Sequence, residues 1–268
     1  MLTLGIDSSG KTASAALVED GVVLGEYSVN IGLTHSQTLL PMVAALFEQT
    51  GRNAAELTLI AVSAGPGSFT GLRIGAATAK GLALAHGIPM AAVSTLEGLA
   101  HNLSSCEDYI HPIMDARRQQ VYTAAYRKGQ LLGEEEAISV EDLCVRINSQ
   151  PGRHVFLGDA VPVYRSYLEE HLTVEHAYAE PMNLLQRASS IACLGEAMQA
   201  CGESCTSDAL ELRYVRKPQA EREREQQGLK DFELVHQEGA EKTKDKLAAR
   251  NYIIGSGSGY ENETEENQ

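Results

Sequence analysis

The segment AGPGSFTGLRIG spans residues 64–75 and is followed by Ala79-Lys80. Within it, Gly65-Pro66-Gly67 allows a sharp turn whose backbone amides no side chain obstructs. A helical pattern then begins near Thr70. A glycine-rich loop that leads into a helix serves α/β proteins in two ways, because it can hold an anion or let a neighbouring backbone come close. The rest of the sequence indicates which of these two uses applies here.

The composition is typical of a globular protein of the cytoplasm. The chain has 268 residues, of which 43% are apolar, so it can form one large domain or two small ones. Its formal charge of −14 disfavours direct binding of a nucleic-acid backbone, because such binding needs clustered Lys and Arg. No signal segment opens the sequence, and no apolar run is long enough to cross a bilayer. The five cysteines form no C-x-x-C pair, and we expect reduced thiols.

Hydrophobic periodicity predicts the same succession of elements twice. In the first half we predict, in order, strands at 2–6, 13–18 and 22–29, a helix at 34–49, a strand at 59–64, a helix at 70–86, a strand at 90–93 and a helix capped by Ser94-x-x-Glu97. In the second half we predict strands at 109–115, 121–126 and 131–137, a helix at 139–148, a strand at 154–157, a helix at 161–170, a strand at 172–176 and a helix at 184–200.

Local signals support several of these boundaries. Glu19-Asp20-Gly21 and Lys128-Gly129 are typical of hairpin turns. Thr34-x-x-Gln37 is a candidate capping box at the start of the first helix. Pro41 lies within that helix and predicts either a kink or a later start.

The repeated β-β-β-α-β-α order predicts an α/β protein of the actin-like ATPase (ASKHA) architecture, with two tandem ribonuclease-H-like units. We expect a first unit at residues 1–104, which carries the candidate partner-binding helices, and a second, smaller unit at 105–217, whose last helix could pack back on the first. Residues 218–268 are polar and end in a Gly/Ser run and an acidic stretch, so we expect a flexible tail.

The segment Gly5-Ile6-Asp7-Ser8-Ser9-Gly10-Lys11-Thr12 matches the phosphate-loop pattern G-x-x-x-x-G-K-T. A phosphate loop needs a helix that begins at Gly-Lys-Thr, whereas here these residues open a strand pattern. We interpret the segment as a strand-turn-strand, with Asp7, Ser8 and Ser9 at its tip. In an actin-like fold this turn faces Asp115 across a cleft, where the two acids could hold a hydrated Mg²⁺ on a nucleotide. Each acid could equally cap its own turn, so a vestigial nucleotide cleft stays one of two alternatives.

The helix after the glycine loop carries small residues at every fourth position, namely Gly71, Gly75, Ala79 and Ala83. Such a stripe lets another backbone approach, either the chain's own sheet or a partner helix. The first helix also has more apolar surface than one face needs. The candidate interface therefore comprises Leu39, Met42, Val43, Leu46, Leu72, Gly75, Ala76, Ala79 and Ala83.

Several motifs together resemble the TsaB (YeaZ) family. They are Ile6-Asp7-Ser8-Ser9, Thr34-His35-Ser36, the run from Gly65 to Gly75, Ser94-Thr95-Leu96-Glu97, Met114-Asp115-Ala116-Arg117-Arg118 and Tyr214-Val215-Arg216-Lys217. The resemblance runs from residue 1 to about Glu225. It implies the dimerisation subunit of the bacterial machinery that makes threonylcarbamoyladenosine in tRNA.

The catalytic paralogue of that family, TsaD, shares the glycine loop but carries a metal-binding His-x-x-x-His. Alignment through Leu96-Glu97-Gly98 puts Thr95 and Leu99 at the two histidine positions, where neither can replace an imidazole. The resemblance therefore implies a non-catalytic subunit with no metal or tightly bound cofactor of its own, with ATP and metal on its partners. It further implies pairing with TsaD through the first two helices, TsaE joining the pair, and modification of adenosine 37 with only indirect tRNA contact. Because the same apolar helices could pair with a second copy, we also predict a homodimer when TsaD is absent.

Two other functions stay open. The first is a stand-alone actin-like phosphotransferase that uses Asp7 and Asp115. The second is a peptidase, the activity for which the wider family was once named. The eight histidines show neither H-x-x-x-H nor H-E-x-x-H spacing, and no nucleophile elbow is present. The sequence therefore shows no motif that could catalyse peptide-bond hydrolysis.

Overall fold

The computed structural model describes residues 1–32 and 34–215. The described residues all belong to one compact unit. The tail predicted at 218–268 lies outside the described residues.

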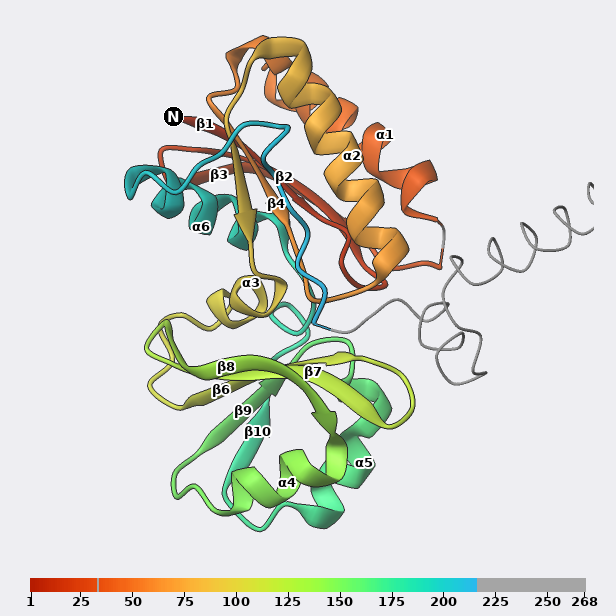
Figure 1. Cartoon of the computed structure of the whole chain (residues 1–268), viewed down its shortest axis with the longest axis vertical. Helices are drawn as coiled ribbons and strands as arrows, with labels where there is room; N and C mark the ends of the chain where they lie inside the picture. Colours follow the sequence, from red (N-terminus) through yellow and green to blue (C-terminus); the bar gives the residue numbers. More distant parts are fainter. Residues whose placement is uncertain (33, 216–268) are drawn as a thin grey trace, which may run out of the picture. The chain divides into compact units, whose positions relative to one another are not determined.

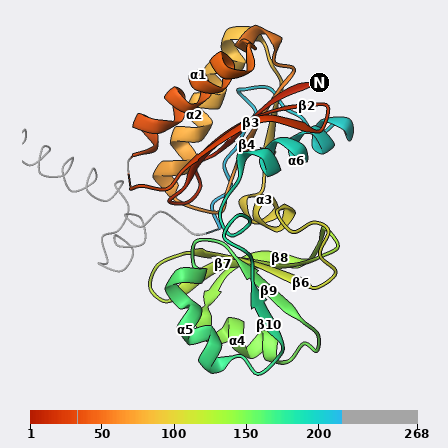
Figure 2. The same cartoon turned by 180° about the vertical axis from the view of Figure 1, so that it is seen from behind.

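The first sheet contains five strands in the order β3-β2-β1-β4-β5 (Figure 1). Its strands are β1 (Leu2–Asp7), β2 (Ala13–Glu19), β3 (Val22–Val29), β4 (Leu59–Ser63) and β5 (Met90–Val93). Strand β1 pairs antiparallel with β2 and parallel with β4, and β4 is parallel to β5. Helices α1 (His35–Thr50) and α2 (Phe69–His86) cover one face of this sheet, and α6 (Ala188–Ala200) covers the other (Figures 1 and 2).

The second sheet also contains five strands, in the order β10-β9-β6-β7-β8. Its strands are β6 (Tyr109–Asp115), β7 (Gln120–Arg127), β8 (Gln130–Ser139), β9 (His154–Leu157) and β10 (His176–Tyr178). Helix α3 (Thr95–His101) contacts β6 and β7, and α4 (Val140–Asn148) contacts β8 and α5 (Val161–His171). A single 3₁₀ turn, η1 (Ala54–Glu56), precedes β4.

The two sheets repeat one arrangement. In each, three strands follow one another in antiparallel pairs, and two further strands are added in parallel on the other side of the first strand. This repeat confirms the prediction of two ribonuclease-H-like units in an actin-like architecture. Helix α6 follows the second sheet in the sequence but packs on the first sheet, against β1, β2, β4 and β5. The domain bounds at 104 and 217 stay a prediction.

Strand β1 is buried on both faces along its whole length. Leu4 and Ile6 are 0% exposed and belong to the apolar cluster under α1 and α2. On the other face the contact is made by small residues. A Cβ atom on Gly5 would collide with the carbonyl of Ala188 in α6. Glycine at this position therefore lets the α6 backbone lie directly against the sheet.

Both predicted hairpin turns are confirmed. Asp20 and Gly21 have φ angles of 48° and 77°, and Lys128 and Gly129 have φ angles of 52° and 73°. Positive φ at both central residues is the geometry of a two-residue turn whose twist matches that of the flanking strands.

The helix starts agree only in part with the sequence signals. The Ser94 hydroxyl accepts a hydrogen bond from the Glu97 amide at 3.3 Å, so the predicted cap of α3 is confirmed. The capping box of α1 is wrong, because the Thr34 hydroxyl donates to Gln37 Oε1 at 2.9 Å and caps no backbone amide. Helix α1 begins ahead of Pro41 and includes it, so a later start is wrong as well.

The helix predicted at 184–200 starts too early. The carbonyl of Leu184 accepts a hydrogen bond from the Gly158 amide at 2.7 Å, and the carbonyl of Leu185 accepts one from Asn102 Nδ2 at 2.9 Å. Both carbonyls therefore bind other elements instead of the amides of a helical turn. Helix α6 begins only after these two residues.

The strand predicted at 172–176 is also misplaced. The Leu172 amide donates to the Leu168 carbonyl at 2.9 Å and so closes α5. The next amide, that of Thr173, donates to Asn148 Oδ1 at 2.8 Å. These bonds hold the chain in a connection, and β10 begins only at the end of the predicted range.

Among residues 1–32 and 34–215, no helix is both long and apolar enough to span a membrane. All five cysteines are free thiols, as expected from their spacing. The cytoplasmic location stays a prediction.

Candidate functional site

The glycine loop packs against the turn between β1 and β2. A Cβ atom on Gly67 would collide with the carbonyl of Ser9, and one on Gly71 would collide with the carbonyl of Ser8. The Ser68 amide donates to the Ser9 carbonyl at 2.6 Å, and the Ser8 hydroxyl donates to the Gly71 carbonyl at 2.9 Å. Of the two uses that a glycine loop can have, the structure supports close backbone approach.

The same loop receives two further segments. Gly65 has a φ of 114°, and a Cβ atom there would collide with the carbonyl of Arg213. The Arg213 amide donates to the Ala64 carbonyl at 2.7 Å, and the Thr95 amide donates to the Gly65 carbonyl at 3.0 Å. The loop therefore joins the β1–β2 turn, the start of α3 and the last described segment of the chain.

Asp7 caps its own turn. Its Oδ1 accepts hydrogen bonds from the Ser9 amide at 2.9 Å and from the Ser9 hydroxyl at 2.6 Å. Asp7 is 1% exposed, and Ser8 and Ser9 are also buried. Burial raises the pKa of Asp7, while the hydrogen bonds from Ser9 oppose that rise. In this conformation the Asp7 carboxylate is closed to a hydrated metal ion.

Asp115 makes an equivalent turn at the end of β6. Its Oδ1 accepts from the Arg117 amide at 2.8 Å, and its Oδ2 lies 3.7 Å from the Arg117 guanidinium. Both predicted acids thus show the turn-capping alternative. In the described part of the chain, no group of three or more His, Cys, Asp or Glu side chains is arranged to hold a metal ion.

Two residues that the sequence did not single out complete this junction. Asp159 Oδ1 accepts from the Asp115 amide at 3.1 Å, and a Cβ atom on Gly10 would meet both Asp159 and the Gln186 amide. Burial raises the pKa of Asp159, and its hydrogen bond with Asp115 opposes the rise. The only sequence signal was that Asp159 comes just after a buried strand, much as Asp7 and Asp115 end theirs. Gln186 carried no signal.

The predicted interface residues lie in the interior. Leu39, Met42, Val43, Leu46, Leu72, Ala76, Ala79 and Ala83 are all at most 8% exposed, and Gly75 is buried. A Cβ atom on Gly75 would collide with the Ser8 hydroxyl oxygen. The small-residue stripe therefore packs against the chain's own sheet, and these nine residues are buried in the isolated chain. Their role in an interface stays a prediction.

The solvent-facing side of the two helices carries different residues. Leu40 is 56% exposed on α1, and Leu84 is 73% exposed on α2. Exposed small residues lie near them at helical spacing, namely Ala44 on α1 and Ala77 and Gly81 on α2. We call these five residues the α1/α2 face. The two helices contact each other along the same side of the sheet (Figures 1 and 2).

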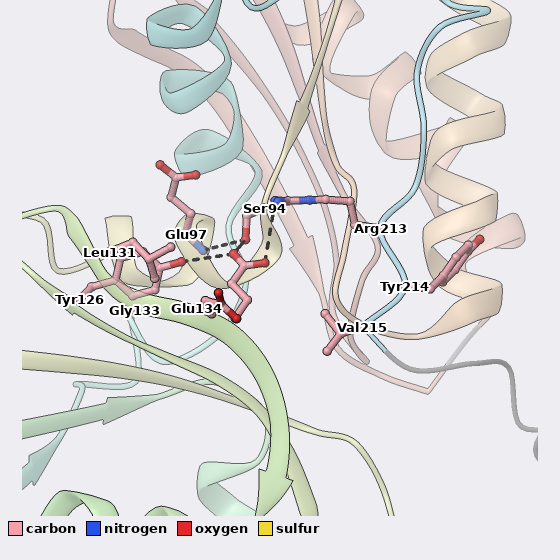
Figure 3. Close-up of a pocket in the computed structure, with 10 residues that line it drawn as sticks. Ser94, Glu97, Tyr126, Leu131, Gly133, Glu134, Arg213, Tyr214 and Val215 are labelled. Carbon is pink, nitrogen blue, oxygen red and sulfur yellow. Dashed lines mark hydrogen bonds and ion pairs between the residues drawn. The ribbon is translucent and has the colours of Figure 1, made fainter.

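A cavity of about 650 Å³ lies between the start of α3, strands β7 and β8 and the segment at 213–215 (Figure 3). The polar contacts beside this cavity converge on Glu135. The carboxylate of Glu135 accepts from the Ser94 hydroxyl and, at 3.4 Å, from the Tyr126 hydroxyl, and lies 3.8 Å from Arg213 Nη2. Burial and the charge of Glu135 raise the pKa of Tyr126. These contacts connect the last described segment with the second sheet.

The two positions aligned with metal-binding histidines have packing roles. Thr95 is 0% exposed and lies in the first turn of α3, next to the cap residue Ser94. Leu99 is 1% exposed and belongs to an apolar cluster with Ile110 and Leu157 of the second sheet. Both side chains therefore contribute to the junction between α3 and its neighbours.

Comparison with known proteins agrees with the motifs. The family model of TsaD, tRNA N6-adenosine threonylcarbamoyltransferase, matches residues 31–224. The "tRNA threonylcarbamoyladenosine biosynthesis protein TsaB" of Bacillus subtilis is 34% identical over 204 residues, which cover 75% of this chain and 89% of that protein. The chain belongs to the TsaB (YeaZ) family.

Two further members of the TsaB family support this assignment. The Escherichia coli TsaB is 36% identical over 132 residues, which are 48% of this chain and 57% of that protein. The solved structure of YeaZ from Pseudomonas aeruginosa superposes with a TM-score of 0.69 at 28% identity, covering 80% of this chain and 99% of that one. The resemblance expected from the sequence motifs is confirmed.

Proposed function

We propose that this chain takes part in the synthesis of threonylcarbamoyladenosine in tRNA as a non-catalytic subunit. In this proposal it binds and supports the catalytic paralogue TsaD, and TsaE joins the assembled pair. Family membership supports the pathway, because the curated relatives carry that pathway in their names. The match to a TsaD family model supports kinship between the two proposed partners.

The single observation that carries the binding role is the α1/α2 face. Two large leucines, Leu40 and Leu84, are exposed at 56% and 73% beside small residues that leave room for another helix. No neighbouring atom fills the space beyond Gly81. Burying a leucine stabilises an association by about 1.5–3 kcal/mol, and small residues let two helices approach closely. Both features favour a helical partner.

The non-catalytic part of the proposal rests on the junction around the glycine loop. The loop packs on Ser8 and Ser9, and the Asp7 carboxylate is closed within its turn. These observations disfavour the alternative of a stand-alone phosphotransferase. We propose that ATP and metal are held by the partner subunits, and that tRNA is contacted only indirectly by a chain of formal charge −14.

Replacement of Leu84 by arginine tests the interface. A buried, unpaired arginine in a helix–helix interface is unfavourable, so we expect Leu84→Arg to weaken binding to purified TsaD by about 100-fold or more. Val145→Arg is the matched control, because Val145 is 67% exposed on α4 of the second sheet. Calorimetry gives the affinity, and a tRNA modification assay with and without the chain gives the function.

The outcomes separate two kinds of failure. If the wild-type chain neither binds TsaD nor raises modification, the proposed function is wrong. If the wild-type pair forms and Leu84→Arg binds with undiminished affinity, only the assignment of the α1/α2 face is wrong. A charged replacement of Gly75 would not serve as a test, because that residue packs on Ser8 inside the protein.

A further inference from the structure

An arginine beside the α1/α2 face is held in place by two aromatic rings. The guanidinium carbon of Arg73 lies 3.7 Å from the centre of the Phe69 ring. The Phe69 ring in turn lies 5.0 Å from the ring of Tyr214. Arg73 Nε donates a hydrogen bond to the Tyr214 hydroxyl at 3.3 Å. Stacking and hydrogen bonding together reduce the freedom of a side chain that is otherwise among the most mobile.

No described residue pairs with the outer nitrogens of this arginine. Within the described residues, Arg73 forms no ion pair, and its only hydrogen bond is made by Nε. Arg165 on α5 is a useful contrast, because its guanidinium also lies over a ring, that of Tyr178 at 4.4 Å, yet faces Glu169 at 3.8 Å. Arg73 thus offers two parallel N–H groups in a fixed plane.

The location of Arg73 connects it to the proposed partner surface. Arg73 lies on the exposed side of α2, one turn ahead of Ala77 and in line with Gly81 and Leu84. Figure 3 shows Tyr214 turned toward α2, whereas its neighbour Arg213 points to the opposite side, toward Ser94. The Arg213 backbone is fixed on the glycine loop, so that loop also positions the tyrosine that orients Arg73.

A pre-ordered guanidinium recognises an oxyanion that can accept two parallel hydrogen bonds, either a carboxylate or a phosphate. The formal charge of −14 disfavours approach of a phosphate backbone. A single carboxylate carried by a protein surface is disfavoured far less, since it brings one charge to a local cation. Arginine beside exposed apolar residues is also a frequent anchor in protein interfaces.

We propose that Arg73 is an anchor of the α1/α2 face and receives a carboxylate, from an Asp or Glu side chain of the bound paralogue. Phe69 and Tyr214 act as positioning residues, because they hold the guanidinium in the orientation that donates two parallel hydrogen bonds to that carboxylate. This inference rests on the proposed function, in which the α1/α2 face binds TsaD. It assigns the polar contact that fixes how the two helix pairs align.

The test compares variants of the full chain for binding to purified TsaD. We expect Arg73→Gln to weaken binding by about tenfold, because a buried carboxylate of the partner would lose its cation. Arg73→Lys should give a smaller loss, since lysine keeps the charge but not the paired N–H groups. Arg165→Gln is the matched control and should bind as the wild type does. Affinity measured against salt should fall less steeply for Arg73→Gln than for the wild type, which a purely structural role would not produce.

The possible outcomes distinguish failure of this inference from failure of the proposed function. If the wild-type pair forms and Arg73→Gln binds as tightly, the inference is wrong while the proposed function stands. If the wild-type pair does not form, both fail, because the inference depends on that pair. If Arg73→Gln keeps the protein pair but weakens binding of tRNA to it, Arg73 contacts phosphate, and the carboxylate proposal is overturned. Phe69→Leu should reproduce part of the loss if the ring orders the guanidinium, and equal binding would contradict the positioning role.

Discussion

At the scale of single residues, the glycines of the GPGSFTGLRIG segment are required by contact. Gly65, Gly67, Gly71 and Gly75 each face an atom that a methyl group would strike, and three of those four atoms are backbone carbonyls. A carbonyl cannot turn aside as a flexible side chain can, so larger residues there would force the segments apart. The crossing of chain segments therefore accounts for the glycines of this motif.

Alanine replacements of two α2 glycines should have opposite effects. Gly75→Ala would push against the Ser8 hydroxyl, and we expect a loss of about 1–3 kcal/mol in the free energy of unfolding. Gly81→Ala meets open space, and we expect a gain of up to about 1 kcal/mol from helix propensity. Urea unfolding of the isolated chain measures both. A Gly75→Ala variant as stable as the wild type would show that the crossing tolerates a side chain.

At the scale of elements, the parallel pairing of β6 with β9 buries two histidines together. His111 Nε2 lies 2.9 Å from His154 Nδ1, and His154 Nε2 lies 2.9 Å from the Gln150 carbonyl. His111 is 4% exposed. Burial and the proximity of His154 lower the pKa of His111 to about 3. Burial, with a second imidazole beside it, therefore favours the neutral form of His111.

This pair should make the protein less stable as the pH falls. The folded pKa of His111 is about 3 and lies below the usual value of 6.5, so between these values the unfolded chain binds more protons. The contribution of His111 is complete above about pH 6.5 and is lost below it, at up to about 1.4 kcal/mol per pH unit. His101, whose pKa is also lowered by burial, acts in the same direction.

The variant His111→Phe isolates this contribution. We expect its free energy of unfolding to depend less on pH between pH 5 and 7 than that of the wild type. Raised carboxyl pKa values, such as that of Asp7, act in the opposite direction, but they are common to both proteins. Equal slopes for the two proteins in urea titrations would contradict a neutral, buried His111.

At the scale of the whole molecule, the net charge opposes self-association, whereas the α1/α2 face favours it. We propose that the isolated chain pairs with a second copy through this face. Two copies of formal charge −14 repel each other, and salt screens that repulsion. The homodimer should therefore tighten when salt rises from about 0.05 to about 0.5 M. Sedimentation of the wild type and of Leu84→Arg measures this, and a variant that dimerises equally well would point to another surface.

Sequence patterns predicted the helices and strands better than they predicted which elements pack against each other. The spacing of Gly71, Gly75, Ala79 and Ala83 correctly indicated a close contact, but spacing within one helix carries no information about what lies opposite. For the same reason the exposed Leu84 was not singled out. Asp159 and Gln186 reach the β1–β2 turn only through the tertiary fold, and no local pattern marks such an encounter.

The position of α6 has a consequence for synthesis on the ribosome. One face of the first sheet, including Gly5 and Ala61, is covered by a helix whose residues are translated only after the entire second sheet. That face of the first sheet therefore stays uncovered on the ribosome until the second half of the chain has been made. Exposed sheet of this kind is a substrate for chaperones and a source of aggregation. A chain cut after residue 104 would lack α6, and this face would stay exposed. The first half of the chain is therefore made first but completes its fold only with the second half.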